Sequence, residues 1–283
     1  MSRGLAGALQ GMSFDPLLSR VAAAHDWDAL TSVADWLVTA DPYGESDSLA
    51  AATRLLGLGE DDVGRHVEHR LWCAWRQAAW VHGREQRLPV KIEGAQWLDE
   101  TSGHPTLVVA PMTLATSDAL VVIATAMGDR EVATYGEDMD PSEGLADADV
   151  NLVGAGSDAV RQIARVLDAG GALCTYADFV YAGHRVVPVT LFGTRRHVAA
   201  GFVAFAARPG AMLLPAVCLA RGDHVVLRFE EPYAVEADEG VSRARLVPLL
   251  APVVAGLLED MIRLAGHQWL LLPTLTFESR DMG

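Results

Sequence analysis

Two aspartates follow apolar segments that are typical of buried strands. Asp118 comes shortly after the run Thr106–Ala110, and Asp178 comes two residues after the run Leu173–Tyr176. In open α/β sheets, ligands bind beyond the carboxyl ends of the strands, so both carboxylates are candidates for a binding or catalytic site. Two structural alternatives stay open: Asp118 could cap a helix, a role that the hydroxyl of Ser117 could equally fill, and Asp178 could be a turn residue.

A histidine six residues after Asp178 could supply a base. His184 lies in a segment from which its imidazole could swing toward the carboxylates. Histidine is the most common general base in proteins. The alternative is an exposed loop histidine, and His197 has the same two interpretations. His104 precedes the first of the two strands, so it should lie roughly 16 Å away at the opposite end of the sheet, and we set it aside.

The chain from residue 101 onward alternates between short apolar runs and amphipathic segments, which predicts an α/β fold. We expect strands at Thr106–Ala110, Val132–Tyr135, Asn151–Val153, Leu173–Tyr176, Val186–Phe192, Met212–Leu219 and Val225–Phe229. We expect helices at about Ser117–Met127, between Ser157 and Gly170, at Arg196–Ala207 and at Val241–Leu264. Strands that alternate with helices indicate a mostly parallel or mixed sheet flanked by helices.

Residues 1–100 have the apolar spacing of helices. Asp15-Pro16 is typical of a helix start, a second helix is expected around Leu30–Leu37, and a third from Glu60, where acidic residues suit a helix N-terminus. We therefore predict a helical N-terminal region (residues 1–100) packed on an α/β core (residues 101–283), in one compact domain.

The charge of the chain argues against two classes of partner. The 283 residues carry a formal net charge of −15, and of the 22 basic residues only Lys91 is a lysine. A strongly acidic protein is repelled by nucleic acid and by anionic lipid surfaces. We expect neither as a partner.

The cysteines and the apolar runs predict a reduced, cytoplasmic protein. Cys73, Cys174 and Cys218 are odd in number and far apart, and each lies in an apolar run, which favours core thiols over a disulfide or zinc framework. A nucleophilic cysteine is the less favoured alternative, since none lies in a Gly-rich turn or beside a plausible base. No run reaches the roughly 20 apolar residues of a membrane span, and no signal peptide is expected.

Three segments of the chain resemble the late acyltransferases of lipid A biosynthesis, the lauroyl and myristoyl transferases. Tyr176-Ala177-Asp178-Phe179, with Leu191-Phe192-Gly193 further on, resembles that family's Asp-Gln or Asp-His element and its Phe-Phe-Gly-like turn. Ala206–Ala211 running into Leu214-Pro215 resembles its Ala-Arg-x-x-Gly-Ala strand, and Gly266–Leu270 its C-terminal tryptophan element. The resemblance covers roughly Gly59 to Leu272 and implies a glycerolipid acyltransferase-like α/β fold.

The family's chemistry rests on a His-x4-Asp/Glu element just after the first core strand, in which the histidine is the general base and the carboxylate orients it. Counting back from Asp118 puts Thr113 at the position of the histidine. A slip of one residue would pair Met112 with Ser117 instead. Neither alignment contains a histidine, and threonine cannot act as a base near neutral pH. The resemblance therefore points to Asp118 and Asp178 for catalysis and places Thr113 and Ser117 at the substrate. His184, from its position after Asp178, is the candidate for a replacement base.

Three arginines could bind an anionic group of the substrate. Arg195 and Arg196 lie at the start of the expected helix at residues 196–207, where the family contacts substrate, and Arg221 follows a strand. The guanidinium fork suits a phosphopantetheine phosphate or a carboxylate. The alternative is a set of solvated surface charges.

The resemblance implies a soluble acyltransferase that moves an acyl group from a thioester, on coenzyme A or an acyl carrier protein, to an amine or hydroxyl of a small-molecule acceptor. Neither a bound cofactor nor a metal is expected, and specialised biosynthetic metabolism is the expected setting. The family's N-terminal membrane anchor and C-terminal basic cluster are missing, so stable membrane anchoring is not expected. Two alternatives remain: an acyl-binding or scaffold relative without catalysis, and a thioester hydrolase on the same fold.

Overall fold

The computed structural model describes residues 27–40, 46–81, 88–114, 116–135, 150–153, 158–178, 185–236 and 242–276. These residues form two compact units. Residues 27–81 and 266–276 make a helical unit, and residues 88–265 make an α/β unit. The boundary therefore precedes residue 88, whereas the sequence suggested a boundary near residue 100. The predicted packing of the helical region on the core stays a prediction.

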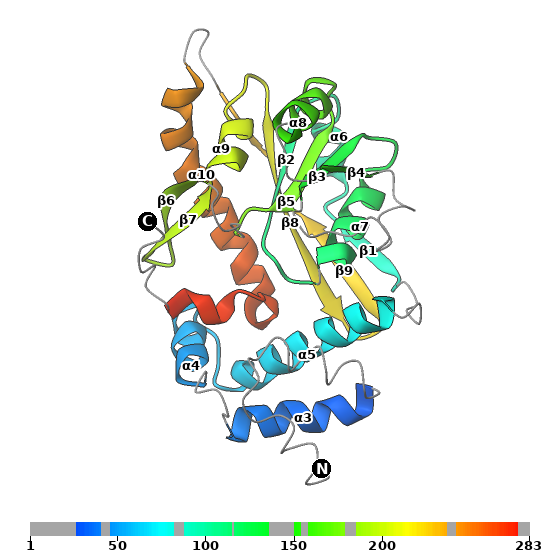
Figure 1. Ribbon diagram of the computed structural model, residues 1–283, viewed down its shortest axis with the longest axis vertical. Coiled ribbons are helices and arrows are strands. Elements are labelled where there is room, and N and C mark those ends of the chain that lie inside the picture. Colours follow the sequence, from blue (N-terminus) through cyan, green and yellow to red (C-terminus); the bar gives the residue numbers. More distant parts are fainter. Residues whose placement is uncertain are drawn as a thin grey trace. The chain divides into compact units, whose positions relative to one another are not determined.

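In the described residues, eight strands form the main sheet of the α/β unit, and seven of them follow the order β1-β9-β8-β2-β5-β3-β4 (Figure 1). The neighbours β1–β9, β8–β2, β2–β5, β5–β3 and β3–β4 are parallel, while β9 and the short β10 run antiparallel to β8. The strand bounds are β1 Val90–Glu93, β2 Thr106–Ala110, β3 Val132–Tyr135, β4 Val150–Val153, β5 Ala172–Tyr176, β8 Met212–Arg221, β9 His224–Phe229 and β10 Tyr233–Ala234. This confirms the predicted α/β class and mixed sheet.

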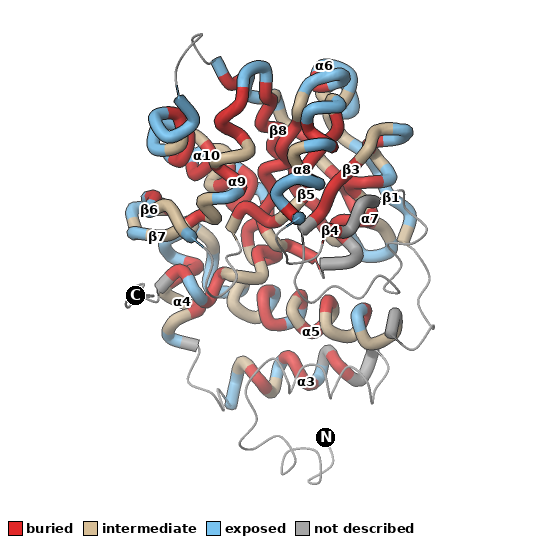
Figure 2. The backbone as a smooth tube through the Cα atoms, turned by 45° about the horizontal axis from the view of Figure 1, so that its top comes forward, coloured by how far each residue is buried: buried red, intermediate tan, exposed pale blue. Residues whose placement is uncertain are grey.

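The centre of the sheet is apolar on both faces. All five residues of β2 are buried, as are the first nine of β8, and Figure 2 shows β3, β5 and β8 largely as buried backbone. The helices that cover these strands are α7 (Thr116–Ala126) and α8 (Ala159–Asp168), which pack against β5, and α9 (Ala200–Ala206) and α10 (Arg243–Ala265), which pack against β2. A short helix, α6 (Gln96–Glu100), lies between β1 and β2. A strand covered on both faces has the continuous apolar run from which β2 was predicted.

The amino ends of the central strands are closed by one arginine. Arg130 donates to the carbonyl oxygens of Gly170 (3.0 Å) and His104 (2.5 Å) and to the hydroxyls of Thr101 (3.1 Å) and Thr106 (2.5 Å). Burial lowers the pKa of its guanidinium. These bonds join the loops that precede β2 and β5. A ligand site is expected at the other end of the sheet, beyond the carboxyl ends of the strands.

The predicted strand at Val186–Phe192 is present as β6 (Val186–Leu191), which forms a separate two-stranded sheet with β7 (Thr194–Ala199). Strand β7 lies where the start of a helix was expected. Phe192 and Gly193 have φ angles of +49° and +74° between the paired residues Leu191 and Thr194. Positive φ at both central residues defines a type I′ turn, which reverses the chain into a hairpin. The prediction of a helix from Arg196 was therefore wrong, and α9 begins at Ala200 after the extended residue Ala199.

The helical unit contains α3 (Trp27–Ala40), α4 (Ser46–Leu55), α5 (Asp61–Val81) and the 3₁₀ segments η2 (Gly266–Gln268) and η3 (Leu272–Thr276). Helices α3 and α5 were predicted, whereas α4 was not. The predicted helix start at Asp15-Pro16 lies outside the described residues. The interior of the unit is formed by apolar side chains of these helices: Leu30, Val33, Leu37, Leu49, Val67 and Leu71.

Candidate functional site

Asp178 and the segment after β2 meet at the carboxyl ends of two neighbouring strands. In the parallel pair β2–β5, Ala110 lies opposite Tyr176, so the residues two positions further on come to the same level. The backbone N–H of Met112 donates to the Asp178 carboxylate, at 3.2 Å to Oδ1 and 3.1 Å to Oδ2. The N–H is thus shared between both carboxylate oxygens, at the long end of the range of hydrogen-bond distances. Asp178 thus holds the chain as it leaves β2.

Thr113 holds the same segment from the other side. Its side chain is fully buried, and its hydroxyl donates to the carbonyl oxygen of Cys218 in β8 at 2.6 Å. Because β5 and β8 flank β2, the residues that lead into α7 are fixed from both neighbouring strands. Position 113, where the resemblance expects a catalytic base, has a structural hydrogen bond.

Asp118 and Ser117 lie in the first turn of α7, which begins at Thr116. The side chains of both residues lie outside the part of the chain that the structure describes, as does the whole of His184. Their predicted roles therefore stay predictions. Helix α7 starts two residues after the buried Leu114, so its first turn follows closely in sequence the segment that Asp178 and Thr113 hold.

The three arginines come from two strands, β7 and β8. Arg195 and Arg196 are neighbours in β7, with Arg195 exposed and Arg196 half-buried. Burial lowers the pKa of the Arg196 guanidinium. Arg221 is exposed at the end of β8, three residues after Cys218. It pairs with His224, the first residue of β9. Two of the three arginines thus belong to β7, and the third belongs to β8.

The cysteines are core residues. Cys73, Cys174 and Cys218 are free thiols and all are buried. Burial raises the pKa of the Cys174 thiol to about 12, so it stays protonated at neutral pH. A nucleophilic role for Cys174 conflicts with this environment.

Two hydrogen-bond partners at the site had no signal in the sequence. The Met112 N–H and the Cys218 carbonyl are backbone groups, and any residue type provides them. Only the pairing of strands distant in the sequence brings them to Asp178 and Thr113.

Within the described ranges, no group of three His, Cys, Asp or Glu side chains is arranged to hold a metal ion. Among the helices of the same ranges, none combines the length and the apolar character needed to cross a membrane. No protein-family model matches the chain, and comparison with curated proteins gives no match.

Proposed function

We propose that this protein is an acyltransferase with a glycerolipid acyltransferase-like fold and a helical N-terminal region. It would transfer an acyl group from a coenzyme A or carrier-protein thioester to an amine or hydroxyl of a small-molecule acceptor. The observation that carries the proposal is the pair of hydrogen bonds that hold Met112 and Thr113 after β2. Asp178 accepts the Met112 N–H, and the Thr113 hydroxyl donates to the Cys218 carbonyl.

The positions of the family-like segments support this proposal. The segment with Asp178 ends β5, the expected catalytic element follows β2, and the segment at Leu214-Pro215 belongs to β8. The order β8-β2-β5 makes these three strands direct neighbours, and Pro215 pairs with Val109. Segments that are far apart in the sequence thus converge on one edge of the sheet, where ligands bind in open α/β folds.

In the proposed reaction the acceptor nitrogen or oxygen attacks the thioester carbonyl, its proton passes to a base, and the C–S bond breaks to release the thiol. Asp118, at the start of α7, is the proposed base or its orienting group, and His184 is the proposed replacement for the family's histidine. Asp178 keeps α7 in place. An amine acceptor needs less help from a base than a hydroxyl, and positioning alone can lower a barrier by roughly 7–11 kcal/mol.

A second candidate function is acyl binding without catalysis. It is favoured by Thr113, which stands where the family has histidine and whose hydroxyl is bonded to a backbone carbonyl. Such a relative would keep the binding surface of the fold while lacking the proton transfer.

The two candidates differ in thiol release. The purified full-length chain is incubated with a panel of acyl-CoA and acyl-carrier thioesters, with and without mixed amines and alcohols, while free thiol is followed. Release that requires an acceptor supports acyl transfer. Release at the same rate without any acceptor identifies a hydrolase. No release from any donor, together with tight binding of a fluorescent acyl chain, supports the non-catalytic protein and contradicts the proposed transferase.

A further inference from the structure

The β6–β7 hairpin lies in an unusually basic part of an acidic chain. Residues 179–222 contain five arginines and neither Asp nor Glu, although the whole chain has 37 acidic residues. Three of these arginines, Arg185, Arg195 and Arg196, are in or next to the hairpin. The hairpin therefore carries positive charge in a molecule whose net charge is −15.

The register of the hairpin determines which backbone groups point outward. Leu191 and Thr194 flank the two-residue type I′ turn and form a hydrogen-bonded pair. Hydrogen-bonded and non-hydrogen-bonded pairs alternate along an antiparallel ladder, so Thr190–Arg195 and Pro188–His197 are non-hydrogen-bonded pairs. The C=O groups of these four residues, and the N–H groups of all but Pro188, are directed away from the partner strand, toward the outer edges of the hairpin.

The two outer edges are not equivalent. On β6, Pro188 occupies an outward position, and proline has no N–H to offer to a further strand, which blocks this edge. On β7, the outward positions are Arg195 and His197, both of which have an N–H. Among the residues that the structure describes, β7 pairs with β6 alone, so its other edge can accept a further strand.

The side chains along this edge are available. Arg195 is exposed, His197 is half-buried, and the two lie on the same face because they are two residues apart in a strand. Among the described residues, neither side chain has a hydrogen-bond or ion-pair partner. The opposite face of the hairpin is the buried one, with Val189, Leu191 and Val198 in the interior.

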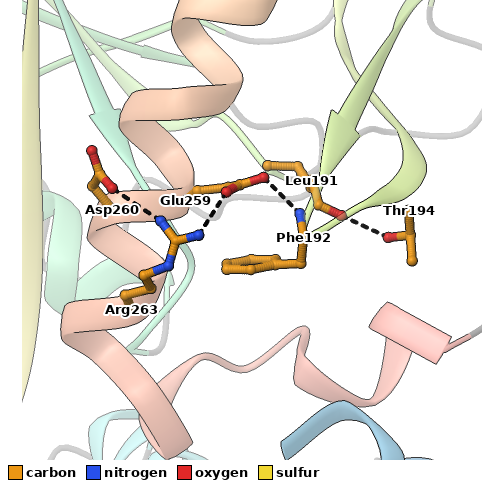
Figure 3. A network of polar contacts seen from close by, with 6 residues as sticks. All are labelled: Leu191, Phe192, Thr194, Glu259, Asp260 and Arg263. Carbon is orange, nitrogen blue, oxygen red and sulfur yellow. Dashed lines mark hydrogen bonds and ion pairs between the residues drawn. The ribbon is translucent and has the colours of Figure 1, made fainter. Parts of the chain in front are cut away.

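The turn of the hairpin is bonded to α10 through Glu259 and Arg263 (Figure 3). The Phe192 N–H donates to Glu259 Oε1 at 2.6 Å, and Arg263 donates to Glu259 Oε2 at 3.0 Å and to Asp260 Oδ1 at 3.1 Å. The Arg263 guanidinium also lies over the Phe192 ring, 5.3 Å from its centroid. These contacts hold Phe192 in a left-handed conformation that a non-glycine residue adopts only when its surroundings impose it. Arg263 is thereby shared by the two carboxylates at the turn, Glu259 and Asp260.

We propose that the outer edge of β7 binds an extended acidic segment of a partner protein, which adds to the hairpin as a third strand. The outward N–H and C=O groups of Arg195 and His197 would bond the backbone of the segment. Carboxylates at alternate positions of the segment would face the two side chains. In this binding mode the main chain provides affinity and the alternate side chains provide specificity.

The test uses the full-length protein and a fluorescent peptide in which glutamate and valine alternate. We expect binding that weakens as NaCl increases, because exposed charges are screened. Arg195→Glu should weaken binding by at least about tenfold, since a like charge then faces the carboxylates. His197→Pro should abolish it by removing the outward N–H, as Pro188 does on the other strand. Arg245→Glu, at an exposed position of α10, is the matched control and should leave binding unchanged.

A peptide methylated on alternate backbone nitrogens, unable to pair as a strand, should fail to bind. Circular dichroism melts check that each variant is folded. Three results would overturn the proposal: the peptide binds Arg195→Glu as strongly as the wild type, the wild type binds the methylated peptide as strongly as the unmodified one, or the wild type binds no peptide at low salt. Because no acyl donor is present, the result does not depend on the proposed enzymatic activity.

Discussion

We propose that Asp178 supports the proposed reaction by holding the segment after β2 and not by transferring a proton. Its oxygens accept the Met112 N–H at 3.1 and 3.2 Å, which an amide oxygen could also do. We therefore expect Asp178→Asn to keep kcat/KM within about threefold of the wild type. Asp178→Ala, which removes the acceptor, should lower it by up to about 100-fold, because a small displacement of a catalytic element has effects of that size.

Hydrogen–deuterium exchange separates this role from simple activity loss. The peptide that covers residues 106–118 should exchange faster in Asp178→Ala than in the wild type and Asp178→Asn. Equal and severe loss of activity in both variants, with unchanged exchange, would show instead that Asp178 is a proton-transfer group.

His66 makes the stability of the helical unit depend on pH. The ring is fully buried, its Nδ1–H donates to the His267 carbonyl at 2.7 Å, and its Nε2 has no partner among the described residues. Burial, followed by the charge of Arg70, lowers the pKa of His66 to about 3. The unfolded state binds a proton near pH 6.5, so the stability that neutral His66 provides is present above pH 6.5 and is lost as the pH falls toward 3.

His66→Asn keeps a donor for the carbonyl and removes the titration. Between pH 7 and pH 5, the wild type should lose about 2 kcal/mol more unfolding free energy than this variant. Urea unfolding followed by tryptophan fluorescence measures this loss, since most of the chain's seven tryptophans belong to the helical unit. Parallel pH dependence in the two proteins would contradict the assignment.

At the residue scale the sequence could indicate Asp178 but not its partner. The position of an aspartate after an apolar run predicts the carboxyl end of a strand. The Met112 N–H and the burial of His66 depend on contacts between distant segments, and no local pattern encodes them. The resemblance places Thr113 at the position of the family's histidine. Only the structure shows that its hydroxyl donates to the Cys218 carbonyl.

The junction between α8 and β5 depends on a glycine that has no space for a side chain. A Cβ at Gly171 would lie 2.6 Å from the Glu131 carbonyl oxygen and 2.6 Å from Val166 Cγ1. We expect Gly171→Ala to lower the unfolding free energy by about 2 kcal/mol, as overpacking of a tight core does. Gly201→Ala in α9 is the control: nothing lies within 4 Å of its Cβ, and it should stabilise by up to about 1 kcal/mol.

Chemical denaturation of the two variants measures both effects. Equal stability of Gly171→Ala and the wild type would show that the α8–β5 junction relaxes easily, contrary to this account.

At the element scale, prediction succeeded where the apolar pattern was long or continuous. Strand β2 was predicted residue for residue, and α10 within two residues at its start, because burial on both faces or on one helical stripe leaves a clear pattern. Residues 196–199 were predicted as helix instead of strand because Arg195-Arg196 resembles a polar helix start. Its structure is decided by the turn at Phe192-Gly193, where a non-glycine residue has positive φ. The exposed edge strand β1 lacked an apolar run and was missed.

The net charge of −15 should act on the whole molecule as self-repulsion. We expect the melting temperature to rise by about 2–4 °C between about 0.02 and 0.2 M NaCl, equivalent to about 1 kcal/mol for a chain of this size. Near the sequence pI of about 4.9 the effect should vanish, because the net charge is then small. A salt effect of the same size at both pH values would show that it arises from something other than net charge.

For the whole molecule, the sequence predicted the α/β class and the mixed sheet. It did not predict that residues 266–276 belong to the helical unit and not to the sheet they follow. This assignment rests on contacts such as the His66–His267 bond, which joins residues 201 positions apart. The spacing of residues along the chain does not predict contacts between residues so far apart in the sequence.

The proposed activity is acyl transfer at the start of α7, and mass spectrometry can detect its product, the acylated acceptor. The donor that releases thiol fastest is incubated with its acceptor and wild type, Asp118→Asn or the control Asp129→Asn, which alters an exposed carboxylate. We predict an acylated acceptor with the wild type and the control, and a rate lower by about 100-fold or more with Asp118→Asn, the size expected for loss of a general base or its orienting group. If Asp118→Asn acylates the acceptor as fast as the wild type, the proposed role of Asp118 is wrong. If the wild type forms no acylated acceptor from any donor, the proposed acyl transfer is wrong.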